Sequence, residues 1–252
     1  NSLSDDPHNQ YLADGMMDAI LTHLSKIKDL RVMSKTSVEQ YRQPKETITE
    51  IGKELNVNYI LEGSFQKSGD SVRLIVQLIK ASDDDHVWSK EYDRNWNEIF
   101  AVQSEVAKSI ARELHSAISP EVNQLIEKIP TANLTAYDFF QRGREEEGKF
   151  SYYDLIASSN VNAGLNPFTR QSVERAEKMY KTALKYDPAF ALAYTGLAGI
   201  YWSKNYYREY FSENFLDSVL ILANTALSFD DQLPDAYYIS GMYYSEHGLY
   251  EQ

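Results

Sequence analysis

The sequence contains no cysteine among its 252 residues. Disulfide bonds, thiolate metal ligands and cysteine nucleophiles are therefore excluded, although this absence fits either side of a membrane. The sequence also lacks an apolar run near the roughly 18 residues that cross a bilayer, and no signal-peptide pattern opens it. Because the chain begins abruptly at NSLSDD and stops at GLYEQ, we expect a fragment of a longer protein.

Basic residues are outnumbered along the whole chain. Acidic residues exceed basic ones by 21 to 15 over residues 1–129 and by 16 to 10 over residues 130–252, which gives a net charge of −12. Contact with nucleic-acid phosphates needs clustered Lys and Arg, and the sequence has no basic stripe. We therefore predict that this region does not bind nucleic acid.

Motifs for catalysis, metal binding and phosphate binding are missing as well. The five histidines form no metal-ligand spacing, and neither a phosphate-cradling glycine loop nor a G-x-S-x-G elbow occurs. The run Asp83 to Asp85 is read as a solvated hairpin turn rather than a cation site, because the EF-hand spacing is absent. Glu145, Glu146 and Glu147 diverge on a predicted helix, which favours a solvated face over a carboxylate pair. We predict no catalytic residue, no metal site and no cofactor.

What the sequence does contain changes character near residue 120. Pro120, Pro130 and the segment PTANLT favour a linker over residues 121–133. Before it, residues 1–120 are predicted to form a small α/β domain with an antiparallel meander, so that the whole chain is α+β followed by an all-α domain. The predicted helices cover 9–27, 47–56 and 96–118, with a turn or brief helix over 37–42, and the predicted strands cover 30–34, 58–67, 71–81 and 86–93.

Two local patterns in this first domain are specific. Thr47, followed three residues later by Glu50, forms a capping box at a helix start. The residues SGD before Ser71 are a hairpin signal, and alternate residues of the following strand are apolar.

The order of motifs over residues 5–118 resembles a known bacterial family. The segments that carry the likeness are YLADGMMDAILTHLSKIKDLRVMSKTS, IGKELNVNYILEGSFQKSGDSVRLIVQLIKASDDDHVWSKEYDR and IFAVQSEVAKSIA. They resemble the cyclase-associated domain, which is related to the FlgO family and to the N-terminal domain of TolB. Members of this family usually begin with an apolar strand ending in Pro-Phe, and this sequence has no such strand. Either that strand lies upstream, or the sheet has an unpaired edge.

Residues 134–252 contain only helical patterns, and one pattern repeats. Small and large residues flank Pro188 at helical spacings, and the same residue types recur 43 positions later. This pattern resembles tetratricopeptide (TPR) repeats, whose unit is about 34 residues long, with the third repeat cut off after its first helix. The insertions SYYDLIASSNVNAGLNPF and SKNYYREYFSENF fall between the two helices of a unit, and NYYREYF at 205–211 is expected to close over a groove or to fill it. The pattern positions are Ala176, Tyr180, Ala183, Tyr194, Ala198, Tyr201, Tyr237, Gly241 and Tyr244.

The repeat resemblance implies a groove along the first helix of each unit, which binds a protein, a peptide or a small ligand. A purely architectural stack, with the tyrosines used for packing, is the alternative. Because the last repeat is cut off, we expect either further repeats downstream or self-association through its exposed surface. The residues predicted to contact a ligand or partner are Tyr137, Phe140, Arg144, Thr195, Trp202, Tyr238 and Met242, and the other groove positions are Glu147, Leu192, Gly199, Asp235 and Ser245.

Together the two resemblances imply a non-catalytic sensory or scaffolding region of a larger bacterial signalling protein. Its effector would be a class III nucleotide cyclase, a DNA-binding regulator or a protein kinase. An upstream segment would tether this region to a membrane. The alternatives are a free-standing cell-envelope structural or assembly protein and an enzyme whose site the motif search misses. A description as adenylate cyclase would be inherited from the family. The compartment stays open, with the periplasmic side of an inner-membrane protein favoured over the cytoplasm.

Overall fold

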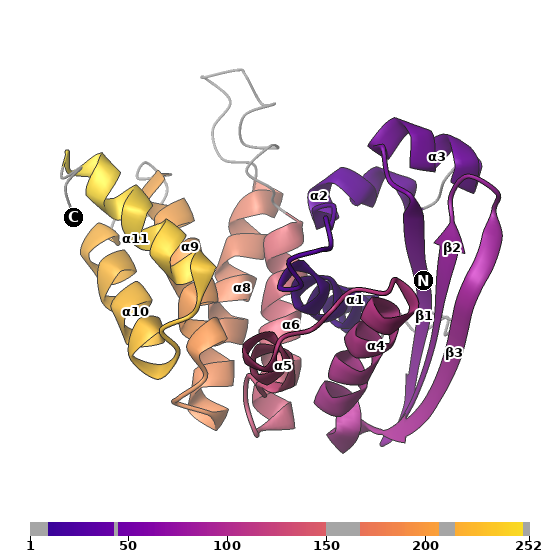
Figure 1. The fold of residues 1–252 in the computed structure, drawn as a ribbon. Coiled ribbons are helices and arrows are strands. Elements are labelled where there is room, and N and C mark those ends of the chain that lie inside the picture. Colours follow the sequence, from indigo (N-terminus) through magenta and orange to yellow (C-terminus); the bar gives the residue numbers. More distant parts are fainter. Residues whose placement is uncertain (1–9, 43–44, 150–166, 207–214, 249–252) are drawn as a thin grey trace. The chain divides into compact units, whose positions relative to one another are not determined.

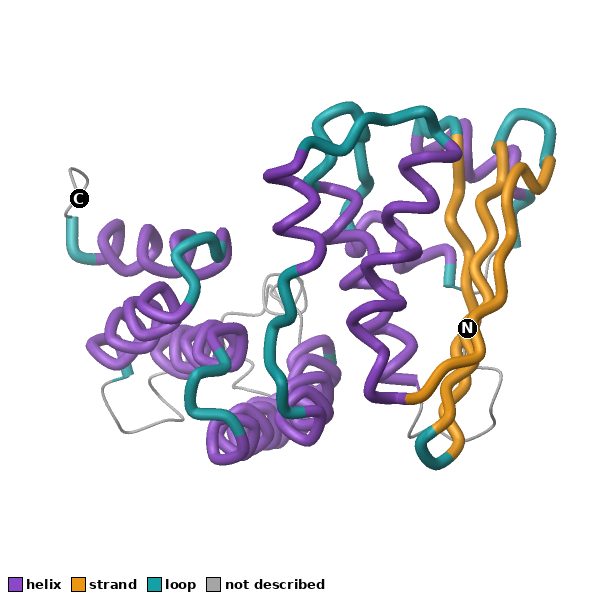
Figure 2. Tube along the Cα trace, turned by 60° about the horizontal axis from the view of Figure 1, so that its bottom comes forward, coloured by secondary structure: helices purple, strands orange, loops and turns teal. Residues whose placement is uncertain are grey.

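The computed structural model describes residues 10–42, 45–149, 167–206 and 215–248. Contacts divide the chain into two compact units, residues 1–129 and residues 130–252. Figure 1 shows the elements of each unit, and Figure 2 shows the three strands and the helices as a tube. Nearly all of the first predicted insertion and most of NYYREYF lie outside the described residues.

The first unit contains an antiparallel sheet in the order β1 (Tyr59–Ser68), β2 (Ser71–Lys80) and β3 (Asp85–Asn95). The hairpin between β1 and β2 turns through Gly69, whose φ of +57° suits a residue without a Cβ. Alternate β2 residues are buried against the helices because successive side chains of a strand point to opposite faces. The predicted meander is therefore confirmed. The buried β2 residues are Val72, Leu74, Val76 and Leu78.

Two helices cover one face of this sheet, α1 (Gln10–Ser25) and α4 (Ile99–Glu113) (Figure 1). Met16 and Ile20 of α1 and Val106 and Ile110 of α4 are at most 2% exposed, as expected for the apolar stripe of an amphipathic helix. A single turn, η3 (Trp96–Glu98), leads into α4. The predicted helical pattern thus places the core of the unit between α1, α4 and the sheet.

The helix α3 (Ile48–Leu55) begins as the sequence predicts. The Thr47 hydroxyl accepts a hydrogen bond from the Glu50 backbone N–H, and the Glu50 carboxylate accepts one from the Thr47 N–H at 2.8 Å. The capping box is therefore confirmed. The Thr47 N–H and the Thr47 hydroxyl both donate to the Glu50 carboxylate, and these two hydrogen bonds lower the pKa of that carboxyl.

Residues 30–34, predicted as a buried strand, are not a strand. No strand of the described residues pairs with them, and an isolated extended segment leaves its backbone groups without a ladder. Directly after them come the short helices α2 (Lys35–Val38) and η2 (Glu39–Tyr41), in the place where a turn or brief helix was predicted.

The segment predicted as a linker begins with a helix, α5 (Pro120–Glu127). Ser119 caps it and Pro120 occupies its first turn, where a missing N–H costs nothing. Ile126 is fully buried, and the Ser104 hydroxyl donates to its carbonyl at 2.7 Å, which fixes α5 on α4. The preceding helix α4 is shorter than predicted, because the chain turns away at His115, whose φ is +52°.

The second unit consists of paired helices. It contains α6 (Leu134–Gly148), α8 (Pro167–Tyr186), α9 (Ala191–Tyr206), α10 (Leu216–Phe229) and α11 (Pro234–Glu246). Asn133 caps α6 with its side-chain oxygen and donates from its amide to the Tyr186 carbonyl at 3.0 Å, which joins the start of α6 to the end of α8. Successive helices pack on one another, so the prediction of a helical domain is confirmed for the residues of this half that the structure describes.

A buried ion pair joins α8 to α9. Lys204 of α9 has a side chain only 8% exposed and pairs with Glu177 of α8, which also pairs with Lys181 at 2.6 Å. Burial raises the pKa of the Glu177 carboxyl, but the hydrogen bonds from Lys181 and Lys204 outweigh it, so the pKa lies below its ordinary value.

Candidate functional site

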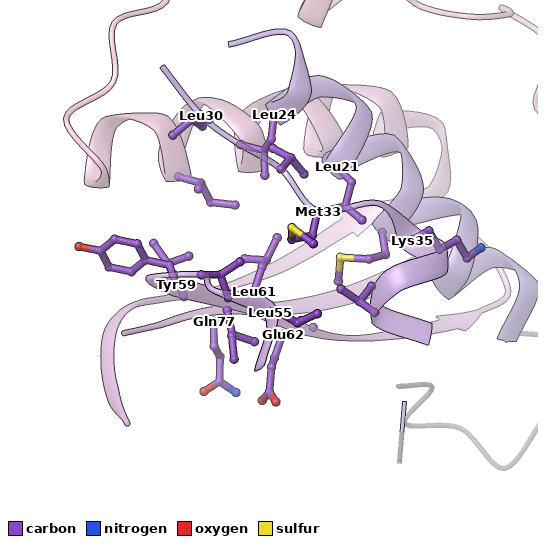
Figure 3. A pocket seen from close by; sticks show the side chains of 18 of the residues that line it. Leu21, Leu24, Leu30, Met33, Lys35, Leu55, Tyr59, Leu61, Glu62 and Gln77 are labelled. Carbon is purple, nitrogen blue, oxygen red and sulfur yellow. The ribbon is translucent and has the colours of Figure 1, made fainter. Parts of the chain in front are cut away.

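The first unit contains a pocket of about 1260 Å³ beside strand β1, lined by both apolar and charged side chains. Figure 3 shows Leu21, Leu24 and Met33 above the strand that carries Tyr59 and Leu61. Its lining comes from α1, from the irregular segment around residues 30–34, from α2 and α3, and from the inner face of β1. A pocket of this volume is large enough for a small molecule or an extended peptide segment.

The pocket runs along the free edge of β1. Among the described residues β1 pairs only with β2, so one row of its backbone N–H and C=O groups has no strand neighbour. The opposite edge, β3, carries exposed charged side chains that discourage further pairing, among them Glu91, Asp93 and Arg94. The β1 edge has fewer such charges, which makes it the better edge for strand addition.

Ion pairs hold the wall of this pocket in place. Lys35 of α2 pairs with the nearly buried Asp18 of α1 at 3.0 Å. Arg42, just beyond η2, pairs with Asp14 of α1 and with Glu39, each at 2.8 Å. Residues 35–42 are thereby fastened to α1.

In the second unit, α9 contacts both α6 and α11, so the first helices of successive pairs form one layer. This is the layer on which the repeat resemblance places a groove. The predicted contact residues divide into two groups within it.

Three of these predicted residues are buried in the packing of the unit. Tyr137 and Phe140 are 4% and 6% exposed, and the Phe140 ring lies 5.0 Å from that of Phe190. Thr195 is 5% exposed, and its hydroxyl donates to the carbonyl of Ala191. These side chains therefore contribute to the core.

The other four predicted residues reach the surface. Arg144 and Tyr238 are exposed, and Trp202 and Met242 are half-buried. Trp202 and Met242 pack against one apolar cluster that includes Ala198 and Ile239, so the structure brings them together between α9 and α11.

A buried tyrosine fixes a carboxyl group at the same layer. Tyr180 of α8 is fully buried, and its hydroxyl donates to Oε2 of Glu147 at 2.5 Å. Burial raises the pKa of the Glu147 carboxyl, while Tyr180 and Arg144 lower it and Asp235 raises it. Desolvation and the Glu147 charge raise the pKa of the Tyr180 hydroxyl.

Two glycines make room for the Tyr180 ring. A Cβ at Gly143 of α6 would lie 2.7 Å from the ring, and one at Gly196 of α9 would lie 2.6 Å from it. Since the ring is enclosed from both sides, it holds the Glu147 carboxyl at a fixed position. The sequence pattern marked Gly143 as a small position, but it gave no sign that Gly196 shares this role.

We predict that Gly196→Ala lowers the free energy of unfolding of the helical unit by about 1–2 kcal/mol. Overpacking against a fixed ring costs about 1–3 kcal/mol, and the better helix propensity of Ala returns at most about 1 kcal/mol. Gly241→Ala is the matched control, because a Cβ there meets no atom within 4 Å. It should stabilise the unit by up to about 1 kcal/mol. Urea unfolding, followed by amide hydrogen exchange in α8 and α9, measures both changes, and equal effects of the two substitutions would contradict the packing argument.

The described residues contain no group of three or more His, Asp or Glu side chains arranged to hold a metal ion. The run Asp83 to Asp85 lies at the exposed turn between β2 and β3, where Asp83 pairs with Lys80 and Asp84 takes a positive φ of 54°. Within the ranges the structure describes, none of the helices combines the length and apolar character needed to cross a membrane.

Comparison with known proteins adds two findings. Residues 6–110 match a regulator domain. The matching family model is that of the second domain of HilA/YgeH-like transcriptional regulators. A protein of Rhizobium meliloti (strain 1021), named "Putative adenylate cyclase 3", is 31% identical over 242 residues. That alignment covers 94% of this chain and 38% of the relative, so the chain spans little more than a third of the relative's length.

These matches agree with part of the resemblance stated for residues 5–118. The regulator and cyclase connections are found, and the arrangement of an α/β unit followed by a helical one is observed. The likeness to FlgO and TolB and the assignment of the helix pairs to TPR repeats stay predictions.

Proposed function

We propose that this chain is a non-catalytic sensory or scaffolding region of a larger bacterial signalling protein. The observation that carries the proposal is the pair of matches. One part of the chain resembles a domain of transcriptional regulators, and nearly all of it resembles a fraction of a protein named as a cyclase. A region that accompanies two different outputs is best explained as a part that recognises a signal or a partner, while the output chemistry belongs to another domain.

The α/β unit supports this reading as a joining domain. Its pocket lies beside the free edge of β1 and includes apolar side chains against which an added strand would pack. Members of the family that residues 5–118 resemble usually begin with an apolar strand, and the resemblance leaves open whether such a strand lies upstream here. We propose that it pairs with β1, so that the preceding part of the protein is built directly into this sheet.

The helical unit supports partner recognition. Its helix pairs, with small residues at close contacts and a 43-residue recurrence, fit TPR repeats, which present one helix layer to a bound segment. Exposed aromatic rings are suited to such binding, and Tyr238 on α11 is 69% exposed. Self-association through α11 is the other use of the same surface.

The proposal that this chain is not itself catalytic is tested by incubating the purified chain with ATP and Mg²⁺ or Mn²⁺. We expect no cyclic AMP above a blank without protein. Cyclic AMP formation proportional to chain concentration, reproduced in independent preparations, would contradict a non-catalytic role.

A further inference from the structure

One acidic side chain in the helix layer α6–α9–α11, that of Glu147, is held by a hydrogen bond from a buried tyrosine. The Glu147 carboxyl lies at the end of α6, and its Oε1 would be 3.5 Å from a Cβ placed on Gly199 of α9. Gly199 has no side chain, so the α9 backbone approaches this oxygen closely, and the Glu147 side chain stays half-buried. The negative charge of Asp235 on α11 raises the pKa of Glu147.

The carboxyl is held in one orientation before any ligand arrives. Its Oε2 accepts the hydrogen bond from Tyr180, whose ring is fixed between Gly143 and Gly196. Binding to a fixed acceptor costs less conformational entropy than binding to a free side chain. Tyr180 therefore acts as a positioning residue for Glu147.

The partly desolvated carboxyl favours a cation as its ligand. Removing a carboxylate from water is costly, and a hydrogen-bonded cation offsets that cost. Arg144, one turn before Glu147, contributes one positive charge, while Glu147 and Asp235 contribute two negative ones, so the three charges sum to −1. One helical turn along α9 from Gly199 lies Trp202, which is half-buried and packs with Met242 against the cluster of Ala198 and Ile239.

We propose that this layer binds a peptide segment of a protein partner through a Lys or Arg side chain seated on Glu147, with a neighbouring apolar residue on Trp202 and Met242. This inference rests on the proposed recognition function and adds the chemistry of the partner. The acidic balance of the helical unit, 16 acidic to 10 basic residues, also favours a basic segment.

The experiment uses the whole 252-residue chain, immobilised, and peptide libraries of the form X4-Z-X4. X is any residue except Cys, and Z is fixed as Lys, Arg, Gln, Met or Glu. We expect the Lys and Arg libraries to be retained at least about fivefold better than the Gln and Met libraries, a ratio of about 1 kcal/mol. Glu147→Gln should abolish this preference, because the amide still accepts from Tyr180 but carries no charge.

Glu145→Gln is the matched control, since it removes the same charge from the next face of the same helix and leaves the preference intact. Glu145 is 38% exposed and pairs only loosely with Lys149, at 3.5 Å. Should Glu147→Gln fail to fold, Tyr180→Phe provides a second variant, which keeps the charge, releases its orientation and is expected to weaken the preference severalfold.

The outcomes separate this inference from the function on which it rests. Retention of peptides with no preference for Lys or Arg, or the same loss in both Glu→Gln variants, would overturn the cation site while leaving partner recognition standing. Retention of no library by the wild-type chain would overturn peptide recognition by this layer altogether.

Discussion

Glu177→Gln is expected to lower the free energy of unfolding of the helical unit by about 3 kcal/mol. The substitution preserves shape but removes the carboxylate that pairs with the buried ammonium group of Lys204, and removing one partner of a buried pair costs about 3–5 kcal/mol. The side chain of Lys204 is 8% exposed, so water offers it little compensation. We expect the low end of the range because the Gln oxygen still accepts one hydrogen bond.

Glu174→Gln is the control for this prediction. Glu174 lies on the same helix and pairs with Arg170 at 2.9 Å, but both side chains are about half exposed. Exposed pairs contribute at most about 1 kcal/mol, so the control should shift stability by less than about 0.5 kcal/mol. Urea unfolding reported by hydrogen exchange in α8 and α9 compares the two. Similar small losses in both variants would show that Lys204 finds solvent or another partner.

Stability of the first unit is expected to fall as the pH drops from 6.5 to 4, because of His23. Burial in α1, with a smaller contribution from Lys26, lowers the pKa of this histidine from 6.5 to about 4. In that window the unfolded chain binds a proton that the folded one does not, so falling pH favours unfolding. A difference of this size corresponds to about 3 kcal/mol at pH 4. Well above pH 6.5 neither state binds the proton, and His23 contributes no pH dependence there.

His23→Gln tests this linkage. The variant should unfold with a flatter pH profile, and the difference between the two profiles isolates His23 from the carboxyl groups that also titrate near pH 4. An NMR titration of the imidazole signals gives the folded pKa directly. Parallel stability profiles, or an imidazole that titrates near pH 6.5 in the folded protein, would contradict the burial argument.

Local signals in the sequence were sufficient for much of the fold. The Thr47 capping box joins residues three apart, and the burial of Val76 and its neighbours follows from the alternation of one strand. Residues 30–34 show the limit of such reasoning, because an apolar run predicts a strand only if another strand pairs with it. The helix at Pro120–Glu127 differs from the predicted linker because Pro120 and Pro130 alone do not distinguish a linker from a helix start. Ser119 followed by Pro120 is also a typical helix start.

The candidate sites depend on contacts that no local pattern contains. Tyr180 and Glu147 are 33 residues apart and lie on different helices, and Glu177 and Lys204 are separated by 27 residues. The prediction that Tyr137 and Phe140 line a groove carried repeat positions over by number, but large aromatic side chains there fill the core instead. The pocket beside β1 forms only when helices and strands distant in sequence pack together, so no local pattern predicts it.

The central claim is that this region recognises something and passes the result to an output domain elsewhere in the protein. The most direct measurement compares the output of the full-length protein with that of a version lacking residues 130–252, across a panel of growth conditions. We expect the shortened protein to keep a measurable basal output whose level no longer changes with the growth conditions. Identical output and identical responses in both proteins, under every condition, would contradict a sensory role for this region.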